Sequence, residues 1–170
     1  MNDSTPHFAD VLDANAAFAE RFTGGDLAPT AARGLAVVTC MDSRIDPFAT
    51  LGIRAGDAKI LRNAGARVTD DVLRTLVLAH YLLGVDRVLV MPHTNCRMAS
   101  ATEAEIHDHI QQEYGVDTRS LEFRTTNDQR ASLLQDVVRI RSYPLLPHDL
   151  AVCGAILDIT TGRLDVVDDA

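Results

Sequence analysis

The sequence predicts an α/β domain in which helices flank a mainly parallel central sheet. Three observations support this fold class. Short apolar runs without regular polar alternation recur along the chain, as expected of strands buried on both faces of a parallel sheet. Helical patterns alternate with these runs, which favours strand-helix-strand units. Near the C-terminus two strand-like runs flank the turn Thr161-Gly162, which predicts a hairpin and hence an antiparallel edge strand.

The first predicted element is an N-terminal amphipathic helix over residues 8–22, ended by Gly24-Gly25. No neighbouring element in the sequence could bury its apolar face, so we expect it to pack on a distant part of the chain or on a second subunit. A chain of 170 residues is most simply one domain. We therefore predict a single domain, with a helical arm over residues 1–33 and an α/β core over residues 34–170. The apolar positions of the helix are Phe8, Val11, Leu12, Ala16, Phe18, Ala19 and Phe22.

The core is predicted to begin with three strands and one helix. The apolar runs at residues 34–39 and 87–91 are strong strand patterns, and residues 58–61 form a weaker one. Between the second and third strands, Thr69 offers an N-cap and is followed by two acidic residues. These features predict a helix that Gly84 ends.

The remaining elements complete the alternation of strands and helices. Residues 62–66 are expected to form a loop after the second strand, and two further helices are predicted over residues 99–114 and 127–141. The last long apolar run, residues 151–159, is predicted to pair with residues 164–167 in the terminal hairpin.

Composition and charge exclude several classes of partner. The net charge of −8 argues against nucleic acid and anionic membranes, because both favour basic surfaces. No apolar run approaches the roughly 20 residues that span a bilayer. The N-terminus lacks the basic start and apolar segment of a signal peptide, and three cysteines do not form a paired framework. We therefore expect a cytoplasmic protein whose thiols are reduced.

Two cysteines and a histidine follow predicted strands and could share a metal ion. Cys40 comes directly after the first strand, and His93 and Cys96 come after the third. The carboxyl ends of parallel strands meet at one edge of the sheet, where ligands bind. Two thiolates and one imidazole suit zinc, and three protein ligands leave an open position for water or substrate. The alternative is that these are unrelated buried thiols.

Asp42 and Arg44 stand beside the first of these ligands. At alternate positions of an extended turn their side chains project to the same side, where they could pair and keep the carboxylate ionised. A surface ion pair, or a helix cap near Asp46-Pro47, would explain the same residues. Asp42 could also accept a hydrogen bond from zinc-bound water, or bind zinc as a fourth ligand.

Three motifs in this order resemble those of the β-class carbonic anhydrases. They are Cys-x-Asp-x-Arg beginning at Cys40, Arg-Asn-Ala-Gly beginning at Arg62, and His-x-x-Cys beginning at His93. The ordered combination is specific, although each motif alone is not. The short chain and the segment through Asp70 and Asp71 resemble the compact bacterial branch, which also contains carbon disulfide and carbonyl sulfide hydrolases.

This resemblance implies a set of roles and partners. It implies that one zinc ion per chain is bound by Cys40, His93 and Cys96, and that Asp42 and Arg44 form the catalytic dyad. In some members the aspartate at the position of Asp42 binds zinc and closes the site. The resemblance also implies a homodimer whose N-terminal helix wraps its partner, with active sites near the subunit interface. Such dimers often pair into a homotetramer.

One residue departs from the pattern of the family. A glycine usually follows the second cysteine ligand, and this chain has Arg97 there. A residue with a Cβ cannot freely adopt positive φ. Arg97 could therefore narrow the pocket, supply positive charge to bicarbonate, or point to solvent.

The leading functional hypothesis is reversible hydration of carbon dioxide to bicarbonate by zinc-bound hydroxide. A second hypothesis keeps the site and takes carbon disulfide or carbonyl sulfide as substrate, and a third is a non-catalytic zinc- or bicarbonate-binding module.

Other candidate residues receive structural interpretations. Cys153 is predicted to be a small buried hydrophobe, His80 a core or interface histidine, and His107 and His109 solvated polar residues.

Overall fold

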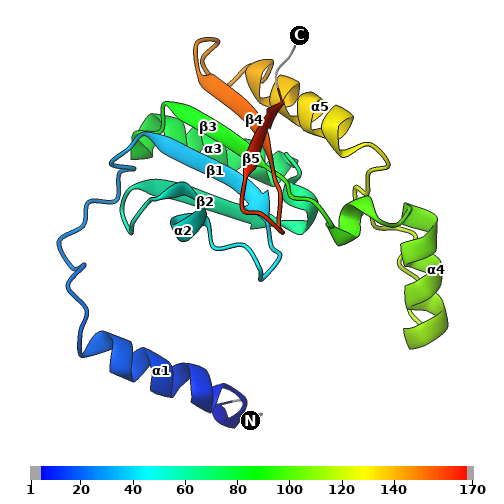
Figure 1. Cartoon of the computed structure of the whole chain (residues 1–170), viewed down its shortest axis with the longest axis horizontal. Helices are drawn as coiled ribbons and strands as arrows, with labels where there is room; N and C mark the ends of the chain where they lie inside the picture. Colours follow the sequence, from blue (N-terminus) through cyan, green and yellow to red (C-terminus); the bar gives the residue numbers. More distant parts are fainter. Residues whose placement is uncertain (1–4, 168–170) are drawn as a thin grey trace.

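A five-stranded sheet forms the centre of the protein, whose computed structural model describes residues 5–167. The strands lie in the order β2-β1-β3-β4-β5 (Figure 1). The first four are parallel and β5 is antiparallel to β4. The α/β class and the antiparallel edge strand are therefore confirmed. The strands are β1 Leu35–Cys40, β2 Ala58–Asn63, β3 Arg87–Met91, β4 Ala151–Leu157 and β5 Leu164–Val167.

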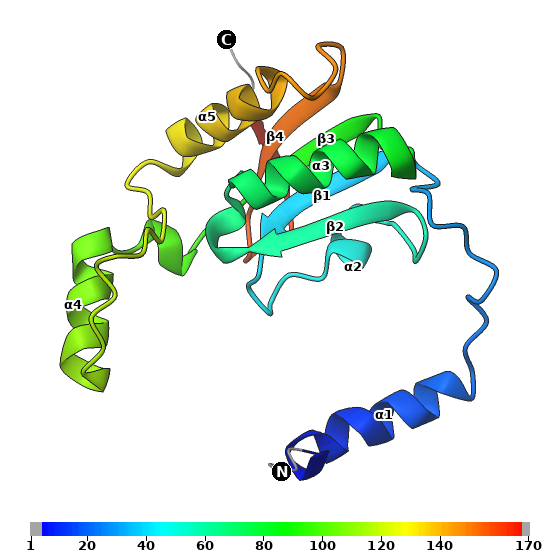
Figure 2. The ribbon, with the colours of Figure 1, turned by 180° about the vertical axis from the view of Figure 1, so that it is seen from behind.

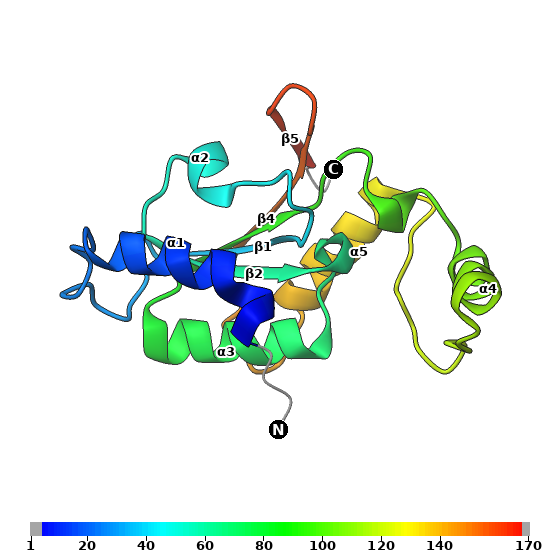
Figure 3. The same cartoon turned by 90° about the horizontal axis from the view of Figure 1, so that it is seen from below.

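Helices α3 (Asp70–Leu83) and α5 (Gln129–Arg141) cover one face of the sheet, and α2 (Pro47–Leu51) lies on the other (Figures 2 and 3). Successive side chains of a strand point to opposite faces, so β1 contributes to both layers. Val38 packs in the cluster formed with α3 and α5, whereas Val37 packs in the cluster on the opposite face. Both faces of β1 are thus buried, as the apolar run predicted.

Helix α3 has the bounds that its capping residues predict. The side chain of Thr69 accepts a hydrogen bond from the backbone N–H of Val72. At the other end Gly84 adopts the left-handed conformation, with φ of 71°, in which glycine is favoured. The predicted second strand is longer than expected, because β2 continues through Asn63 and shortens the loop that follows it.

Two other helices begin later than predicted. Thr102 and Glu105 form a reciprocal capping box, so α4 spans Glu103–Tyr114, and the preceding residues form the short 3-10 helix η3 (Arg97–Ala99). Asp128 caps α5 by accepting from the N–H of Ala131. Across the described residues, no helix combines the length and apolar character needed to cross a membrane.

The short helix α2 was not predicted, although its signals are present in the sequence. Asp46 accepts hydrogen bonds from the N–H groups of Phe48 and Ala49, Pro47 occupies the first turn, and Gly52 ends the helix with φ of 58°. Five residues are too few to show helical periodicity, so only the capping residues could have revealed this element.

The N-terminal helix α1 (Ala9–Ala19) follows a short 3-10 helix, η1 (Thr5–Phe8), and has no buried residue. Figure 1 shows it separated from the sheet by an extended connection. The second half of this connection contacts the core: Lys59 donates a hydrogen bond to the carbonyl of Pro29, and Ala31 and Ala32 donate to the carbonyls of Leu83 and Gly56. The apolar face of α1 therefore has no partner within the described part of its own chain.

Candidate metal centre

The structure brings the three predicted ligands together at the carboxyl edge of the sheet. Cys40 is the last residue of β1, and His93 and Cys96 follow β3, which lies next to β1. All three residues are buried, and their ligand atoms lie within 4.8 Å of one another. The two sulfur atoms are 3.9 Å apart. The cluster could hold one metal ion.

The donor atoms of this cluster fit zinc. The Nδ1 atom of His93 lies 2.8 Å from the carbonyl oxygen of Thr94, so Nδ1 carries the proton and Nε2 presents a lone pair. Nε2 is buried and has no hydrogen-bond partner among the described residues, which is costly unless another group binds it. Tetrahedral zinc with zinc–sulfur distances of about 2.3 Å places two sulfurs about 3.8 Å apart, close to the observed 3.9 Å.

The surroundings of the two sulfurs favour a thiolate at Cys40. The pKa of Cys40 is lowered, first because the Cys96 thiol can donate to it and further because backbone N–H groups point at its sulfur. One of these is the N–H of Gly65, 3.4 Å from Sγ of Cys40. The pKa of Cys96 is raised by the same sulfur–sulfur contact and by burial. The two sulfurs are close enough for one thiol to donate to the other, and a metal ion bound by both would displace protons from the pair.

Asp42 and Arg44 form the predicted pair beside this cluster. The Oδ1 atom of Asp42 accepts from Nε of Arg44 at 2.9 Å, and Oδ2 accepts from Nη2 at 2.7 Å. These bonds, together with the backbone N–H of Arg44, hold the pKa of Asp42 well below its usual range. Nη2 also lies 3.3 Å from the carbonyl oxygen of Asn95, in the turn between His93 and Cys96. The pair thus joins the two ligand-bearing loops.

The Arg-Asn-Ala-Gly motif supports the Cys40 loop, a role that sequence reasoning did not assign. Arg62 donates to the carbonyl oxygens of Cys40 and Asp42, at 2.9 and 2.7 Å. The turn η2 (Ala64–Ala66) then presents Gly65 to the cysteine. Gly65 has φ of 79°, and a Cβ there would lie 3.1 Å from Cβ of Met98. Its conformation and its surroundings both favour glycine.

Arg97 begins η3 and is exposed. It is not among the described non-glycine residues with positive φ, so its Cβ causes no backbone strain. The pKa of Glu105 on α4 is lowered mainly by the backbone N–H of Thr102, and the charge of Arg97 contributes. Arg97 therefore faces solvent on the side of α4, which agrees with the third of the alternatives considered for it.

The other candidate residues lie outside the cluster. The prediction for Cys153 was wrong, because this thiol is exposed: it points to the face of β4 that α5 does not cover. His107 is not simply solvated, since its side chain is mostly buried and contacts Thr118 and Glu103, whereas His109 is exposed. Within residues 5–167, Cys40, His93 and Cys96 form the only group of three or more such ligands close enough to share a metal.

Fold and site together define a metalloprotein of the α/β class with a Cys-His-Cys centre at the carboxyl ends of its strands. The model of the carbonic anhydrase family matches residues 35–164. The chain is 35% identical to β-carbonic anhydrase 1 of Mycobacterium tuberculosis, over 93% of this chain and 96% of that protein. It belongs to the β-carbonic anhydrase family, in which the carbonic anhydrases are zinc-dependent lyases.

Two further relatives show the breadth of this family. A crystal structure of carbonic anhydrase from Streptococcus mutans superposes with a TM-score of 0.89, at 37% identity, over 95% of this chain and 98% of that one. A carbon disulfide hydrolase of Acidianus sp. is 30% identical over 78% of this chain and 76% of that protein. The relatives of this chain therefore include enzymes named for different substrates.

Proposed function

We propose that this protein catalyses the reversible hydration of carbon dioxide to bicarbonate and a proton. The observation that carries the proposal is the position of an ionised carboxylate beside the unpartnered ligand atom. Oδ2 of Asp42 lies 3.7 Å from Nε2 of His93, while Arg44 keeps this carboxylate charged. A hydrogen-bond acceptor is thus fixed next to the place where the three ligands would hold zinc.

The roles of the residues follow from their contacts. Zinc held by Cys40, His93 and Cys96 would lower the pKa of a water molecule toward neutrality and so supply a nucleophile. Asp42 cannot donate a proton, because its low pKa keeps it ionised; it acts as an acceptor that orients the nucleophile toward carbon dioxide. Arg44 fixes both oxygens of Asp42 and so sets the direction of the accepting lone pairs.

A closed state, in which Asp42 becomes a fourth zinc ligand, also belongs to the proposal. In the described structure Asp42 is paired with Arg44 and is not part of the three-residue ligand group. Both side-chain oxygens of Asp42 accept hydrogen bonds from Arg44, and zinc binding by Asp42 would compete with these bonds. The pairing of Asp42 with Arg44 supports an open site as the active form, with the closed form as its alternative.

The apolar face of α1 supports a homodimer as part of the same proposal. Phe8, Val11, Leu12, Phe18 and Phe22 are each at least half exposed, although such side chains are normally buried. A second copy that covers this face would remove the apolar surface from water. A homotetramer would require a further contact between such dimers. A reducing cytoplasm would keep Cys40 and Cys96 available as ligands.

Carbon disulfide or carbonyl sulfide is the second candidate substrate. The observation in its favour is the identity with carbon disulfide hydrolases, which is close to the identity with the carbonic anhydrases. Both molecules have an electrophilic carbon that the same nucleophile could attack.

Stopped-flow measurement of carbon dioxide hydration by the zinc-loaded protein tests the leading function. We expect activity that rises with pH, as a larger fraction of the nucleophile is deprotonated. A fully zinc-loaded protein that hydrates no carbon dioxide above pH 8 would contradict the proposal. Release of hydrogen sulfide from carbon disulfide or carbonyl sulfide, measured in parallel, would assign the second substrate class instead.

A further inference from the structure

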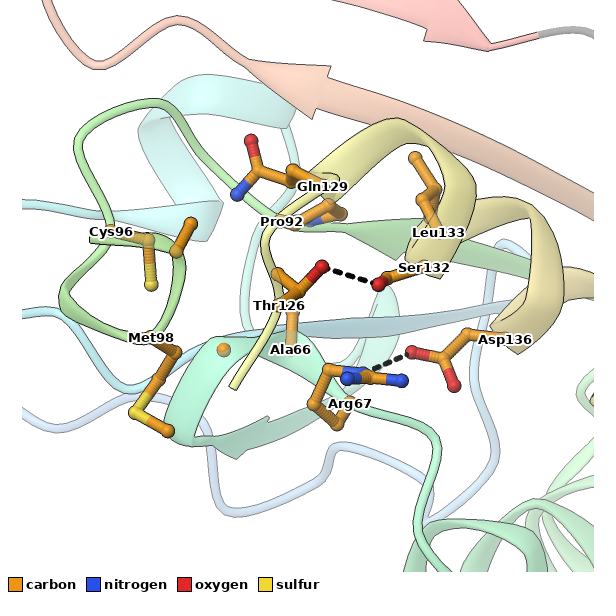
Figure 4. Close-up of a pocket in the computed structure, with 12 residues that line it drawn as sticks. Ala66, Arg67, Pro92, Cys96, Met98, Thr126, Gln129, Ser132, Leu133 and Asp136 are labelled. Carbon is orange, nitrogen blue, oxygen red and sulfur yellow. Dashed lines mark hydrogen bonds and ion pairs between the residues drawn. The ribbon is translucent and has the colours of Figure 1, made fainter. Parts of the chain in front are cut away.

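A buried ion pair behind the metal centre has no role in the proposed reaction. Nε of Arg67 donates to Oδ2 of Asp136 at 2.7 Å, and the two side chains are only 17% and 7% exposed. Figure 4 shows the guanidinium of Arg67, which directly follows η2, directed at the carboxylate of Asp136 on α5. Burying two charges costs free energy that their attraction often fails to recover, so stability alone does not account for the pair.

Arg67 is held at both its side chain and its backbone. A second guanidinium nitrogen, Nη1, donates to the carbonyl oxygen of Arg124 at 3.1 Å. The side chain of Asn63 accepts from the N–H of Arg67 at 2.8 Å and donates to its carbonyl oxygen at 2.7 Å. The planar guanidinium can make the contacts to Asp136 and Arg124 at the same time, which an ammonium group could not do with the same geometry. The residue that ends the η2 turn is therefore fixed in place.

The turn that Arg67 ends is strained. Gly65 and Ala66 have φ of 79° and 58°, so two consecutive residues adopt the left-handed region. This region is unfavourable for alanine, and such conformations persist only where the surroundings over-determine them. The turn places the N–H of Gly65 3.4 Å from Sγ of Cys40, where it donates a hydrogen bond. A hydrogen bond to a ligand sulfur stabilises its negative charge and changes its donation to the metal.

We propose that Arg67 and Asp136 form a clamp that holds the η2 turn against α5 and so keeps the Gly65 N–H on the Cys40 sulfur. Both are positioning residues, because they act on the metal centre through the turn and touch no ligand atom. The clamp rests on the proposed metal site but not on carbon dioxide as the substrate. Its loss should weaken zinc binding and alter the electronic character of the Cys40 thiolate.

The test replaces both members of the clamp by apolar residues of similar size, in Arg67→Met/Asp136→Leu. Replacing both charges, rather than one, leaves no unpaired buried charge and favours folding. Arg139→Met is the matched control, because Arg139 pairs with Asp70 and also joins α5 to the region after η2, but on the surface. Zinc affinity is measured by competition with a chromophoric chelator. The thiolate is observed through the sulfur-to-metal charge-transfer band of the cobalt(II)-substituted protein.

We expect the double variant to bind zinc about tenfold more weakly, as is typical when an outer partner of a metal ligand is lost. Its charge-transfer band should move to lower energy, because a thiolate without its N–H donor gives up an electron more easily. Arg139→Met should match the wild type in both measurements. A folded double variant with wild-type zinc affinity and band position would overturn the clamp.

If the double variant does not fold, Arg67→Lys tests the clamp instead. It retains a charge opposite Asp136 but cannot hold both partners of the guanidinium, so the band should shift in the same direction by a smaller amount. An unchanged band in this variant would also overturn the clamp. Failure of the wild-type protein to hydrate carbon dioxide, with normal zinc binding, would contradict the proposed function and leave the clamp intact.

Discussion

Oδ2 of Asp42 lies 3.7 Å from Nε2 of His93, the buried ring nitrogen that has no hydrogen-bond partner within residues 5–167. The distance is too long for a hydrogen bond, so the two groups face each other across a space that a shared ligand could bridge. Asp42 could lie in this position either to contact the nucleophile or to complete a structural zinc site. Replacing Asp42 should have a different result in each case.

Asp42→Ala separates these two roles. If Asp42 orients the nucleophile, the variant should lose about 10²- to 10⁴-fold in hydration rate, the usual contribution of a positioned acid–base group. It should keep stoichiometric zinc, because the three ligands remain. Stopped-flow kinetics and metal analysis check both parts. Loss of zinc together with loss of thermal stability would instead indicate a closed four-ligand structural site.

Removal of the metal should destabilise the fold. A ligand that binds only the native state at 100 times its Kd adds about 2.7 kcal/mol to the free energy of unfolding. We therefore expect the thermal midpoint to fall when a chelator removes zinc, and expect no such shift in Cys40→Ser. Cys153→Ser is the control, since this thiol is exposed and outside the cluster. Equal chelator effects in the two variants would exclude Cys40 as a ligand.

Arg44→Gln should raise the pKa of Asp42 toward the ordinary value of about 3.9. In the native protein this pKa is lowered by the Arg44 side chain, so the carboxylate stays ionised at a pH where an ordinary aspartate is protonated. Stabilisation from such a group is present above the unfolded pKa and is lost as the pH falls through the folded pKa. In the variant this stabilisation is therefore absent at every pH above the unfolded pKa, including neutral pH.

Carbon-13 NMR titration of the aspartate carboxyls measures this change. Asp158 is the internal control, because its pKa of about 2 is due first to the Thr160 hydroxyl and then to the backbone N–H of Thr160. Asp158 should titrate identically in wild type and variant. If Asp42 did so as well, Arg44 would not be the cause of its acidity.

Gly65→Ala should destabilise the protein more than Gly162→Ala. Both glycines have positive φ, of 79° and 72°, so each substitution carries the penalty of about 1–2 kcal/mol for a Cβ in the left-handed region. Only at Gly65 would the new Cβ also crowd Met98, whereas Gly162 has open space around it. Denaturant unfolding gives the two free energies. Equal losses would show that the turn can adjust around Met98.

Charges on the apolar face of α1 should dissociate the proposed homodimer. The rings of Phe18 and Phe22 lie with their centroids 5.5 Å apart and are both exposed in the isolated chain. Phe18→Asp/Phe22→Asp would place two carboxylates in any apolar contact, so we expect sedimentation velocity to report monomers. Tyr114→Ser, an exposed aromatic on α4, is the control. A double variant that sediments like the wild type would exclude this face from the interface.

The sequence was sufficient to predict the convergence of the ligands. Cys40 and His93 each follow an apolar run, and parallel strands end at a common edge, so chain order and strand type place both residues at that edge. The pairing of Asp42 with Arg44 is also local, since a single residue lies between them in the sequence. In both cases short-range rules determine the geometry.

Contacts between distant segments could not be predicted in this way. Arg67 and Asp136 are 69 positions apart, and only the tertiary structure brings them together. The left-handed Ala66 contradicts the preference of its own residue type, because its surroundings outweigh local propensity. Cys153 was predicted to be buried because an apolar strand pattern does not show which face of the strand a helix covers. At β4, helix α5 covers the face that carries Val152 and Gly154.

The position of β1 between β2 and β3 has a consequence for biosynthesis. Cys40 and Cys96 are 56 positions apart, and the intervening chain contains β2 and α3. During synthesis, Cys40 emerges from the ribosome before Cys96. The two residues can come together only after β3 has been synthesised and has paired with β1. Closing so long a segment costs entropy that strand pairing, rather than the ion, must first overcome. We therefore expect metal capture to follow the pairing of β3 with β1 during maturation.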